Sequence, residues 1–268
     1  AARIQLGRPT DAGRDLRASH GPARAVMGNN VLAHVDDPAG FLRGAAALLA
    51  DDGLVVIEVP YLGELVDRLE YDTIYHEHLS YFSVTALRHL TEAAGLRIVR
   101  IDRLPVHGGT IRMYAGLVSH HRDHGADANA MAAAARAAGL TGPARYDRFA
   151  RDVAANRDRL RGMLEELAAA GHALAAYGAP AKGNTLLNYC GIGTGLVPWT
   201  VDRNPLKVGT FTPGMHLPVL PVETVEARKP DYLLVLAWNF AEEIMAQQDP
   251  HRRRGGRFIL PIPEPVLR

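Results

Sequence analysis

The stretch DPAGFLRGAAALLADDGLVVIEVP (residues 37–60) decides the fold class. Asp37 can cap a helix, Pro38 suits its first turn, and Gly53 is a typical helix end. The run LVVIEVP (54–60) that follows is almost continuously apolar, which is typical of a strand buried on both faces of a sheet. A helix that leads directly into a buried strand indicates an α/β domain.

The neighbouring residues continue this alternation. Residues 23–35 predict a strand followed by a polar loop, and residues 83–95 predict a helix capped by a serine. Residues 96–105 and 110–118 predict an antiparallel pair of strands. The alanine-rich residues 127–169 have helical spacing without sustained heptads, so we expect a connector of one or two long helices.

The C-terminal part begins a second alternation of strands and helices. Residues 172–179 and 231–238 predict strands, and residues 180–193 predict a loop that runs into a helix. A final strand is expected in 257–265. Strand, helix and strand in succession predict a parallel sheet with helices on its faces. The chain is therefore expected to form two α/β domains joined by a helical bridge.

Composition limits the classes of partner and site. A net charge of +1 gives no electrostatic reason to expect a nucleic acid or a membrane as a partner. The single cysteine, Cys190, leaves no disulfide framework and no cysteine-rich zinc site within these residues, and it fits a reducing compartment. No apolar run is long enough to span a bilayer and no signal peptide is visible, so we expect a cytoplasmic location. The sequence indicates no oligomeric state.

The stretch YDTIYHEHLSYFS (71–83) carries the residues best suited to chemistry. His76 and His78 are two residues apart, whereas a helical metal motif needs histidines four apart, so a metal ion would need further ligands from elsewhere. A general acid or base needs only one histidine, a carboxylate that orients it and a phenol that donates a hydrogen bond. A packed aromatic segment with satisfied histidines is the third interpretation.

The stretch YGAPAKGNT (177–185) resembles a cradle for an anion. Its small residues let backbone N–H groups approach a phosphate at the start of a helix, and Lys182 could add a charge. A plain tight turn between a strand and a helix is the alternative. The spacing of the glycines fits neither the dinucleotide fingerprint nor the Walker pattern.

Longer motifs resemble a known family. Residues 29–62 look like the second half of a class I S-adenosylmethionine-dependent methyltransferase. Four further motifs are similar, in this order, to the sugar C-methyltransferases of deoxysugar pathways: YDTIYHEHLSYFS (71–83), LPVHGGTIRMY (104–114), YGAPAKGNTLLNYCGIG (177–193) and VDRNPLKVGTFTPGMHLPVLP (201–221). Those enzymes methylate C-3 of a nucleotide-linked 4-keto-deoxyhexose.

The resemblance implies a fold, a reaction and a set of ligands. It implies a partial, Rossmann-like methyltransferase core in 1–122, a helical connector in 123–170 and a Rossmann-like nucleotide-sugar-binding domain in 171–268. S-adenosylmethionine would donate the methyl group, and a nucleotide-linked sugar of the dTDP type would accept it through an enolate. The family's zinc module and glycine-rich cofactor loop have no counterpart in these residues, so zinc is expected only in such a module and cofactor binding is expected to be incomplete.

Roles for individual residues follow from the same resemblance. His78 is expected to be the general base, and we hypothesise that Glu77 orients or polarises the site while Tyr75 donates a hydrogen bond to a sugar or enolate oxygen. His34 would be a second histidine that faces both ligands. The further candidates are Asn29 and Asn30 at the reactive end of the cofactor, His107 at the border of the cleft or simply in a hairpin turn, and Lys182, Asn184, Thr185 and Asp202 at the nucleotide.

Two other functions stay open. The first is an NAD-dependent nucleotide-sugar oxidoreductase, for which Asp202 lies in the right region of the second strand although the glycine fingerprint is missing. The second is a catalytically incomplete chain that only binds a nucleotide sugar.

Overall fold

The computed structural model describes residues 9–106 and 108–268, and these form two compact units. Unit 1 contains the chain up to Leu65 together with His76–Tyr146, and unit 2 contains Val66–Tyr75 together with Asp147–Arg268. These limits differ from the boundaries at 122 and 170 that the sequence suggests, and the domain assignment made there stays a prediction. None of the described helices is both long and apolar enough to cross a membrane.

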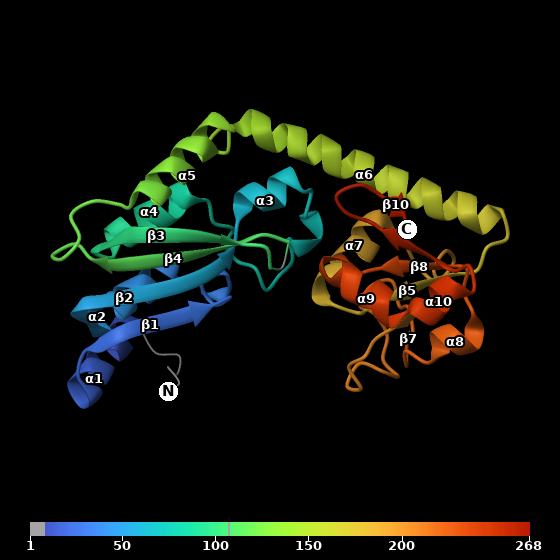
Figure 1. The fold of residues 1–268 in the computed structure, drawn as a ribbon, viewed down its shortest axis with the longest axis horizontal. Helices are drawn as coiled ribbons and strands as arrows, with labels where there is room; N and C mark the ends of the chain where they lie inside the picture. Colours follow the sequence, from blue (N-terminus) through green and yellow to red (C-terminus); the bar gives the residue numbers. More distant parts are fainter. Residues whose placement is uncertain (1–8, 107) are drawn as a thin grey trace. The chain divides into compact units, whose positions relative to one another are not determined.

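The first half of the chain forms a mixed sheet with helices. In chain order its elements are α1 (Pro9–His20), β1 (Ala23–Asn29), η1 (Leu32–His34), α2 (Pro38–Leu48), β2 (Leu49–Pro60), α3 (Leu62–Asp67), η2 (Tyr71–Thr73), α4 (Val84–Ala93), β3 (Leu96–Leu104), β4 (Thr110–Leu117) and α5 (Ala126–Ala137). The strand order is β1-β2-β4-β3, with β1 and β2 parallel and the other pairs antiparallel, as Figure 1 shows. The predicted antiparallel pair, β3 and β4, is confirmed.

A local signal explains where α2 begins but not where it ends. Asp37 accepts a hydrogen bond from the Gly40 N–H at 2.8 Å and begins α2, as its sequence position predicts. The prediction that this helix extends to Gly53 is wrong, because Leu49 already pairs with Ala23 of β1. A Cβ atom on Gly53 would lie 2.8 Å from the Ala23 carbonyl oxygen, so the glycine allows the two strands to approach and does not end a helix.

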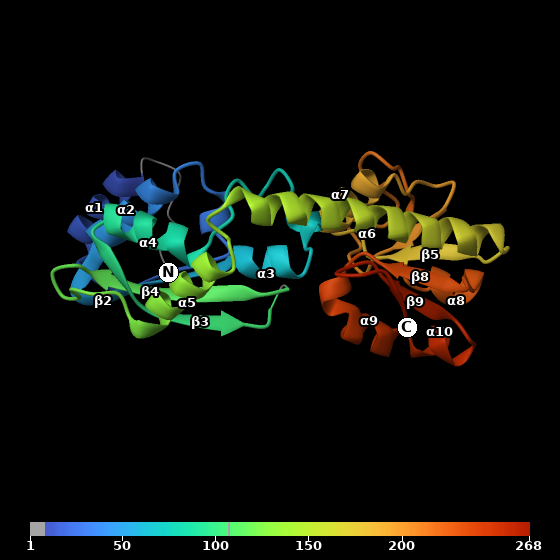
Figure 2. The same ribbon diagram turned by 90° about the horizontal axis from the view of Figure 1, so that it is seen from above.

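The core of unit 1 lies on one face of its sheet. Val55, Ile57 and Val59 of β2 are buried there against α2 and α4, which cover this face in Figures 1 and 2. Val56 between them is half-buried, and Met27 of β1 is 74% exposed. The expectation that 54–60 is buried on both faces is therefore wrong for the described residues. Strand periodicity sends alternate side chains to a face that these helices do not cover.

The second half of the chain forms a largely parallel sheet. Its elements are α6 (Pro143–Ala169), β5 (Leu174–Tyr177), α7 (Ala181–Cys190), β6 (Thr200–Val201), β7 (Val219–Leu220), α8 (Thr224–Arg228), β8 (Tyr232–Val235), η3 (Trp238–Phe240), α9 (Ala241–Gln247), α10 (Asp249–Arg253), β9 (Arg257–Leu260) and β10 (Val266–Leu267). The strand order is β10-β9-β8-β5-β6-β7, and only β10 runs antiparallel to its neighbour.

Helices cover both faces of this second sheet. Leu174 and Ala176 of β5 pack on one side with apolar residues of α6 and α7. Ala175 and Tyr177 point to the other side and pack with residues of α8 and α9. A parallel sheet buried on both faces is the arrangement that its apolar strands predict. The expected α/β fold class is confirmed, and the second sheet has the strand order of a Rossmann-like fold.

Candidate functional site

Two of the predicted catalytic residues lie together in unit 1. His34 is the last residue of η1, and His78 lies in the loop that precedes α4. The centroids of their imidazole rings are 4.9 Å apart and the ring planes meet at 64°, an edge-to-face contact. The structure thus joins two imidazoles that the sequence separates by α2 and β2.

Backbone hydrogen bonds hold this histidine pair in place. The N–H groups of Leu79 and Ser80 both donate to the carbonyl oxygen of Ala33, at 2.8 and 3.3 Å. Ala33 precedes His34 and Leu79 follows His78, so these bonds bring the two rings to the same place. His34 is exposed and His78 is half-buried, which leaves the pair accessible to a ligand.

The neighbours of His78 have different surroundings. Glu77 is exposed and lies in unit 1, whereas Tyr75 is half-buried and is the last residue of the segment that belongs to unit 2. Their assigned roles stay predictions. His107, which was expected to border the site, lies outside the described residues. Across residues 9–106 and 108–268, no group of three or more histidine, cysteine or acidic side chains is arranged to hold a metal ion.

Asn29 and Asn30 lie at the carboxyl end of β1. Asn30 has a φ of 53°, in the left-handed region that asparagine tolerates, and its N–H donates to the carbonyl oxygen of Glu58 at 2.9 Å. The Glu58 carboxylate is buried and accepts two hydrogen bonds from Arg112, at 2.7 and 3.0 Å. The side chains of both asparagines are exposed, so their carboxamides are available to donate to and accept from a ligand.

Lys182 belongs to a polar cluster within unit 2. Its amine donates to the side-chain oxygen of Asn239 and lies 4.2 Å from the centroid of the Trp238 ring. The indole N–H of Trp238 donates to Oδ2 of Asp72 at 2.6 Å. We call Asp72, Lys182, Trp238 and Asn239 the Asp72 cluster. Lys182 therefore has partners inside the protein as well as a place near the start of α7.

Burial dominates the electrostatics of the Asp72 cluster. The side chain of Asp72 is 0% exposed, and burial raises its pKa to about 6, although the charge of Lys182 and the hydrogen bond from Trp238 both act to lower it. Burial also lowers the pKa of Lys182, against the opposing effect of Asp72. Neither Asp72 nor Trp238 is among the functional residues that the sequence predicts. Asp72 lies within the motif at 71–83, but its hydrogen-bond partner Trp238 is 166 residues away in the sequence.

The remaining nucleotide candidates occupy the first sheet crossover of unit 2. Asn184 and Thr185 are half-buried in the first half of α7. The side-chain oxygen of Asn184 is buried and accepts no hydrogen bond from the part of the chain that the structure describes. The start of a ten-residue helix favours an anion through its N–H groups and dipole. An anion at this turn stays a prediction.

The sequence leaves open whether Asp202 only caps the turn before Asn204-Pro205, and the structure gives it such a structural task. Its Oδ2 accepts a hydrogen bond from the Ala179 N–H at 2.7 Å, and its Oδ1 accepts one from the Asn204 N–H at 2.8 Å. The Lys207 amine lies 3.8 Å from Oδ2 and donates to the Ala179 carbonyl oxygen at 2.8 Å. Asp202 thus fastens the loop after β5 to the loop after β6. Much of its hydrogen-bonding capacity is used inside the protein.

Comparison with protein-family models gives two matches along the chain. Residues 105–263 match the family described as C-methyltransferase C-terminal domain. Residues 7–101 match a family described as methyltransferase domain. The two matches lie in the same order as the two sheets.

One curated relative covers nearly the whole chain. The C-methyltransferase NovU of Streptomyces niveus is 39% identical over 262 residues, which are 98% of this chain and 62% of the relative. The chain therefore spans about three fifths of the length of that relative.

Likeness to solved structures is weak. An O-methyltransferase from neocarzinostatin biosynthesis, solved with S-adenosylmethionine and a naphthoic acid, covers 41% of this chain and 38% of its own, with 19% identity and a TM-score of 0.28. An O-methyltransferase family protein from Burkholderia thailandensis covers 39% of this chain and 34% of its own, with 17% identity and a TM-score of 0.29. Similarity at this level carries no argument about function.

Proposed function

Because the chain belongs to the C-methyltransferase family, we propose that it takes part in transferring a methyl group from S-adenosylmethionine to C-3 of a nucleotide-linked 4-keto-deoxyhexose. The observation that carries this proposal is the accessible pair of His34 and His78, held together by backbone hydrogen bonds in unit 1. An imidazole free to reach a substrate is the group that carbon deprotonation near neutral pH needs.

In this proposal His78 removes the proton from C-3, next to the C-4 ketone. The electrons of the broken C–H bond form an enolate, and negative charge develops on the C-4 oxygen. The hydroxyl of Tyr75 donates a hydrogen bond to a sugar or enolate oxygen, and Glu77 orients the base. The edge contact with His34 restricts how the His78 ring can turn.

The residues at the end of β1 fit one part of the proposed cofactor. The exposed carboxamides of Asn29 and Asn30 offer both donors and acceptors at the carboxyl edge of a sheet, where ligands of such folds bind. When bound, S-adenosylmethionine supplies an electrophilic methyl group to the carbon that has lost its proton. His34 lies four residues beyond Asn30, and the family resemblance makes it the candidate to face both ligands.

The turn into α7 is the proposed place of the nucleotide. Lys182, Asn184 and Thr185 all lie within α7. The side-chain oxygen of Asn184 accepts no hydrogen bond from the described residues, so a ligand N–H or hydroxyl could satisfy it. The nucleotide is proposed to be of the dTDP type. Asp202 contributes indirectly in this picture, because it fixes the Ala179 N–H and the shape of the turn.

The oxidoreductase alternative has less support. It would use Asp202 to bind the ribose of NAD, as acidic residues do at this place in dinucleotide-binding folds. Here the Asp202 carboxylate accepts hydrogen bonds from Ala179 and Asn204 and pairs with Lys207. The other alternative is a catalytically incomplete chain that only binds a nucleotide sugar. Experiment must distinguish it from the methyltransferase.

Proton exchange in heavy water tests the base without requiring methyl transfer. The chain is incubated with dTDP-4-keto-6-deoxyglucose in heavy water. NMR follows the loss of the C-3 proton signal. Transfer of a labelled methyl group from S-adenosylmethionine is measured in parallel. We expect exchange that depends on the chain and on His78, because enolate formation precedes methyl transfer.

The two assays separate the competing functions. Proton exchange without methyl transfer would support the enolising site. It would mean that methyl transfer fails because the chain does not bind the cofactor productively. Binding of the nucleotide sugar with neither exchange nor transfer would favour the incomplete, ligand-binding chain. Hydride transfer to NAD with no exchange of the C-3 proton would refute the proposal in favour of an oxidoreductase.

A further inference from the structure

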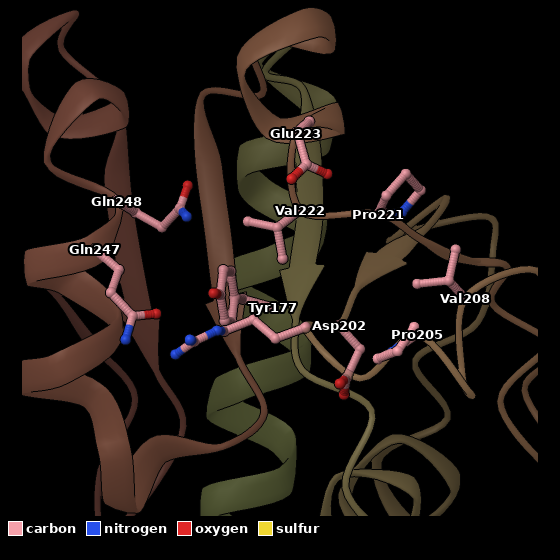
Figure 3. A pocket seen from close by; sticks show the side chains of 10 residues that line it. Tyr177, Asp202, Pro205, Val208, Pro221, Val222, Glu223, Gln247 and Gln248 are labelled. Atoms are coloured by element: carbon pink, nitrogen blue, oxygen red, sulfur yellow. The ribbon is translucent and has the colours of Figure 1, made fainter.

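A pocket lies at the carboxyl edge of the sheet of unit 2. It has a volume of about 670 Å³, within the range of small-molecule sites. Tyr177 at the end of β5 and Asp202 after β6 line its floor, and Figure 3 shows Gln247 and Gln248 on one wall and Pro205 and Val208 on the opposite wall. A smaller hollow shares Tyr177, Asp202 and Gln247 with it and continues toward Gly178 and Ala237.

The topology of the sheet makes this edge a preferred place for a ligand. From β5 the chain crosses through α7 to β6 on one side, whereas β8 on the other side of β5 leads on to β9. Strand order thus reverses between β5 and β8. Crevices at such a reversal, beyond the carboxyl ends of the strands, are where open α/β sheets bind nucleotides.

The floor of the pocket carries an unused polar group. Tyr177 is only 3% exposed, and its hydroxyl has no hydrogen-bond partner of normal geometry among the described residues. Burial raises the pKa of Tyr177, and the nearby Arg203 charge and Gln248 side chain act to lower it. A buried hydroxyl without a partner costs stability unless a ligand satisfies it. The phenol is therefore a donor available to a bound molecule.

The charges around the pocket argue against a phosphate. The Arg203 guanidinium lies 3.5 Å from the Glu243 carboxylate, and Asp202 has Lys207 as its partner. Glu223 adds a further negative charge to the lining. The described lining thus offers no excess of positive charge, and an uncharged ligand with hydrogen-bonding groups fits it better than an anion.

The remaining side chains suit a flat heteroaromatic ring. The side-chain nitrogen of Gln247 donates to the Glu243 carboxylate at 2.6 Å, and its second hydrogen and the carboxamide oxygen can serve a polar ring edge. The guanidinium of Arg203 is mostly exposed and can stack on a ring face, while Val208 and Val222 supply apolar surface. Glu223 can accept hydrogen bonds from hydroxyl groups.

From these features we propose that the pocket binds a nucleoside, with the base held by Tyr177, Arg203 and the carboxamide of Gln247. The chemistry is that of an uncharged base with a hydroxylated sugar. The source is either a free nucleoside or the nucleoside part of the proposed nucleotide-sugar substrate. The site does not depend on methyl transfer, since none of its three base-contacting residues has a role in the proposed reaction.

Calorimetric titration of the full chain with thymidine and with adenosine tests the site. We expect at least one nucleoside to bind, and deoxyribose and inorganic phosphate at the same concentrations not to bind. Tyr177→Phe should weaken binding about 2- to 10-fold, the effect of one hydrogen bond to the ligand. Arg203→Ala should weaken binding to a similar degree through loss of stacking.

The controls make each result decisive. Arg252→Ala removes another exposed arginine that pairs with an acid, Asp249, and should bind the nucleoside like the original chain. His78→Asn should also bind the nucleoside normally. Loss of methyl transfer would therefore not imply loss of nucleoside binding. Displacement of the nucleoside by a dTDP-sugar would identify the substrate as its source, and simultaneous binding would identify a separate ligand. Failure of both nucleosides to bind a folded chain, or unchanged binding by both pocket variants, would overturn the proposal.

Discussion

Asp72 and His78 stand six residues apart in one short segment, yet their surroundings are opposite. Asp72 is completely buried in unit 2, where its carboxylate accepts the indole N–H of Trp238. His78 is half-buried in unit 1, with its ring against the exposed ring of His34. The Asp72 end of the segment is held by buried polar contacts. The His78 end is held by backbone hydrogen bonds and is accessible.

The difference separates two uses of polar side chains. A buried carboxylate is costly, and a protein keeps it only where partners fix its position. Tyr71 next to it is also buried, and its hydroxyl donates to Asn156 at 2.9 Å. We infer that the Asp72 end positions the segment and the His78 end acts on a ligand. Variants at the two ends should therefore change different observables.

The largest expected effect is on turnover at the accessible end. His78→Asn should lower the rate of C-3 proton exchange by roughly 10²- to 10⁴-fold, the usual contribution of a general base. The unfolding midpoint in urea should barely move, because the ring is not part of the buried core. Exchange measured by NMR and unfolding measured by fluorescence give the two readouts. His89→Asn, on the exposed side of α4, is the matched control and should keep full exchange.

At the buried end, Asp72→Asn should raise stability rather than change turnover. The folded-state pKa is raised from 3.8 to about 6, so the native state holds the proton more tightly than the unfolded chain does. Native stability therefore falls as pH rises from about 4 to about 6, and the full cost of the buried charge is present above pH 6. That cost is at most about 3 kcal/mol, and asparagine removes it while still accepting the indole hydrogen bond.

Urea unfolding at several pH values measures this difference. The variant should exceed the original chain in unfolding free energy at pH 8, and the advantage should shrink toward zero as pH falls to about 4. An advantage that is the same at pH 8 and pH 4, or a variant that is less stable at pH 8, would show that the Asp72 charge is not a cost to the fold.

Removal of the indole donor should have a smaller effect of opposite sign. Trp238→Phe keeps an aromatic ring beside Lys182 but leaves the Asp72 carboxylate without its 2.6 Å hydrogen bond. We expect a loss of about 1–3 kcal/mol in unfolding free energy at pH 7, because a buried acceptor loses its partner. In the Asp72→Asn background the same change should cost less, and a double-mutant cycle at pH 7 measures that coupling. Equal costs in both backgrounds would show that the Asp72 charge does not strengthen this hydrogen bond.

Much of the fold was predictable because local signals and burial agree. The capping Asp37 and the alternation after residue 171 gave the right elements, and the apolar run 54–60 gave a strand although not its burial on both faces. The errors lie where tertiary pairing overrides local preference. Gly53 looks like a helix end, but Leu49 already pairs with Ala23, so the chain is a strand there.

The candidate site was predictable only in part, for a related reason. His78 and the stretch around it are conspicuous in the sequence, and the resemblance pointed to His34. The partner of Asp72 could not be found, because Trp238 lies 166 residues away and no local pattern joins them. The turn cap of Asp202 before Asn204 could be anticipated, but its hydrogen bond from the Ala179 N–H could not, because side-chain motifs do not report bonds to a distant backbone.

The smallest expected effect concerns the residue that follows the accessible end. Ser83 caps α4, and its Oγ accepts the Ala86 N–H at 3.1 Å. Ser83→Ala should lower the unfolding free energy by about 1 kcal/mol, the usual value of such a cap. If the histidine end is held by its own bonds to Ala33, proton exchange should stay within about twofold of the original rate. A large loss of exchange at unchanged stability would mean that the cap positions His78, and the two ends of the segment would then be fastened alike.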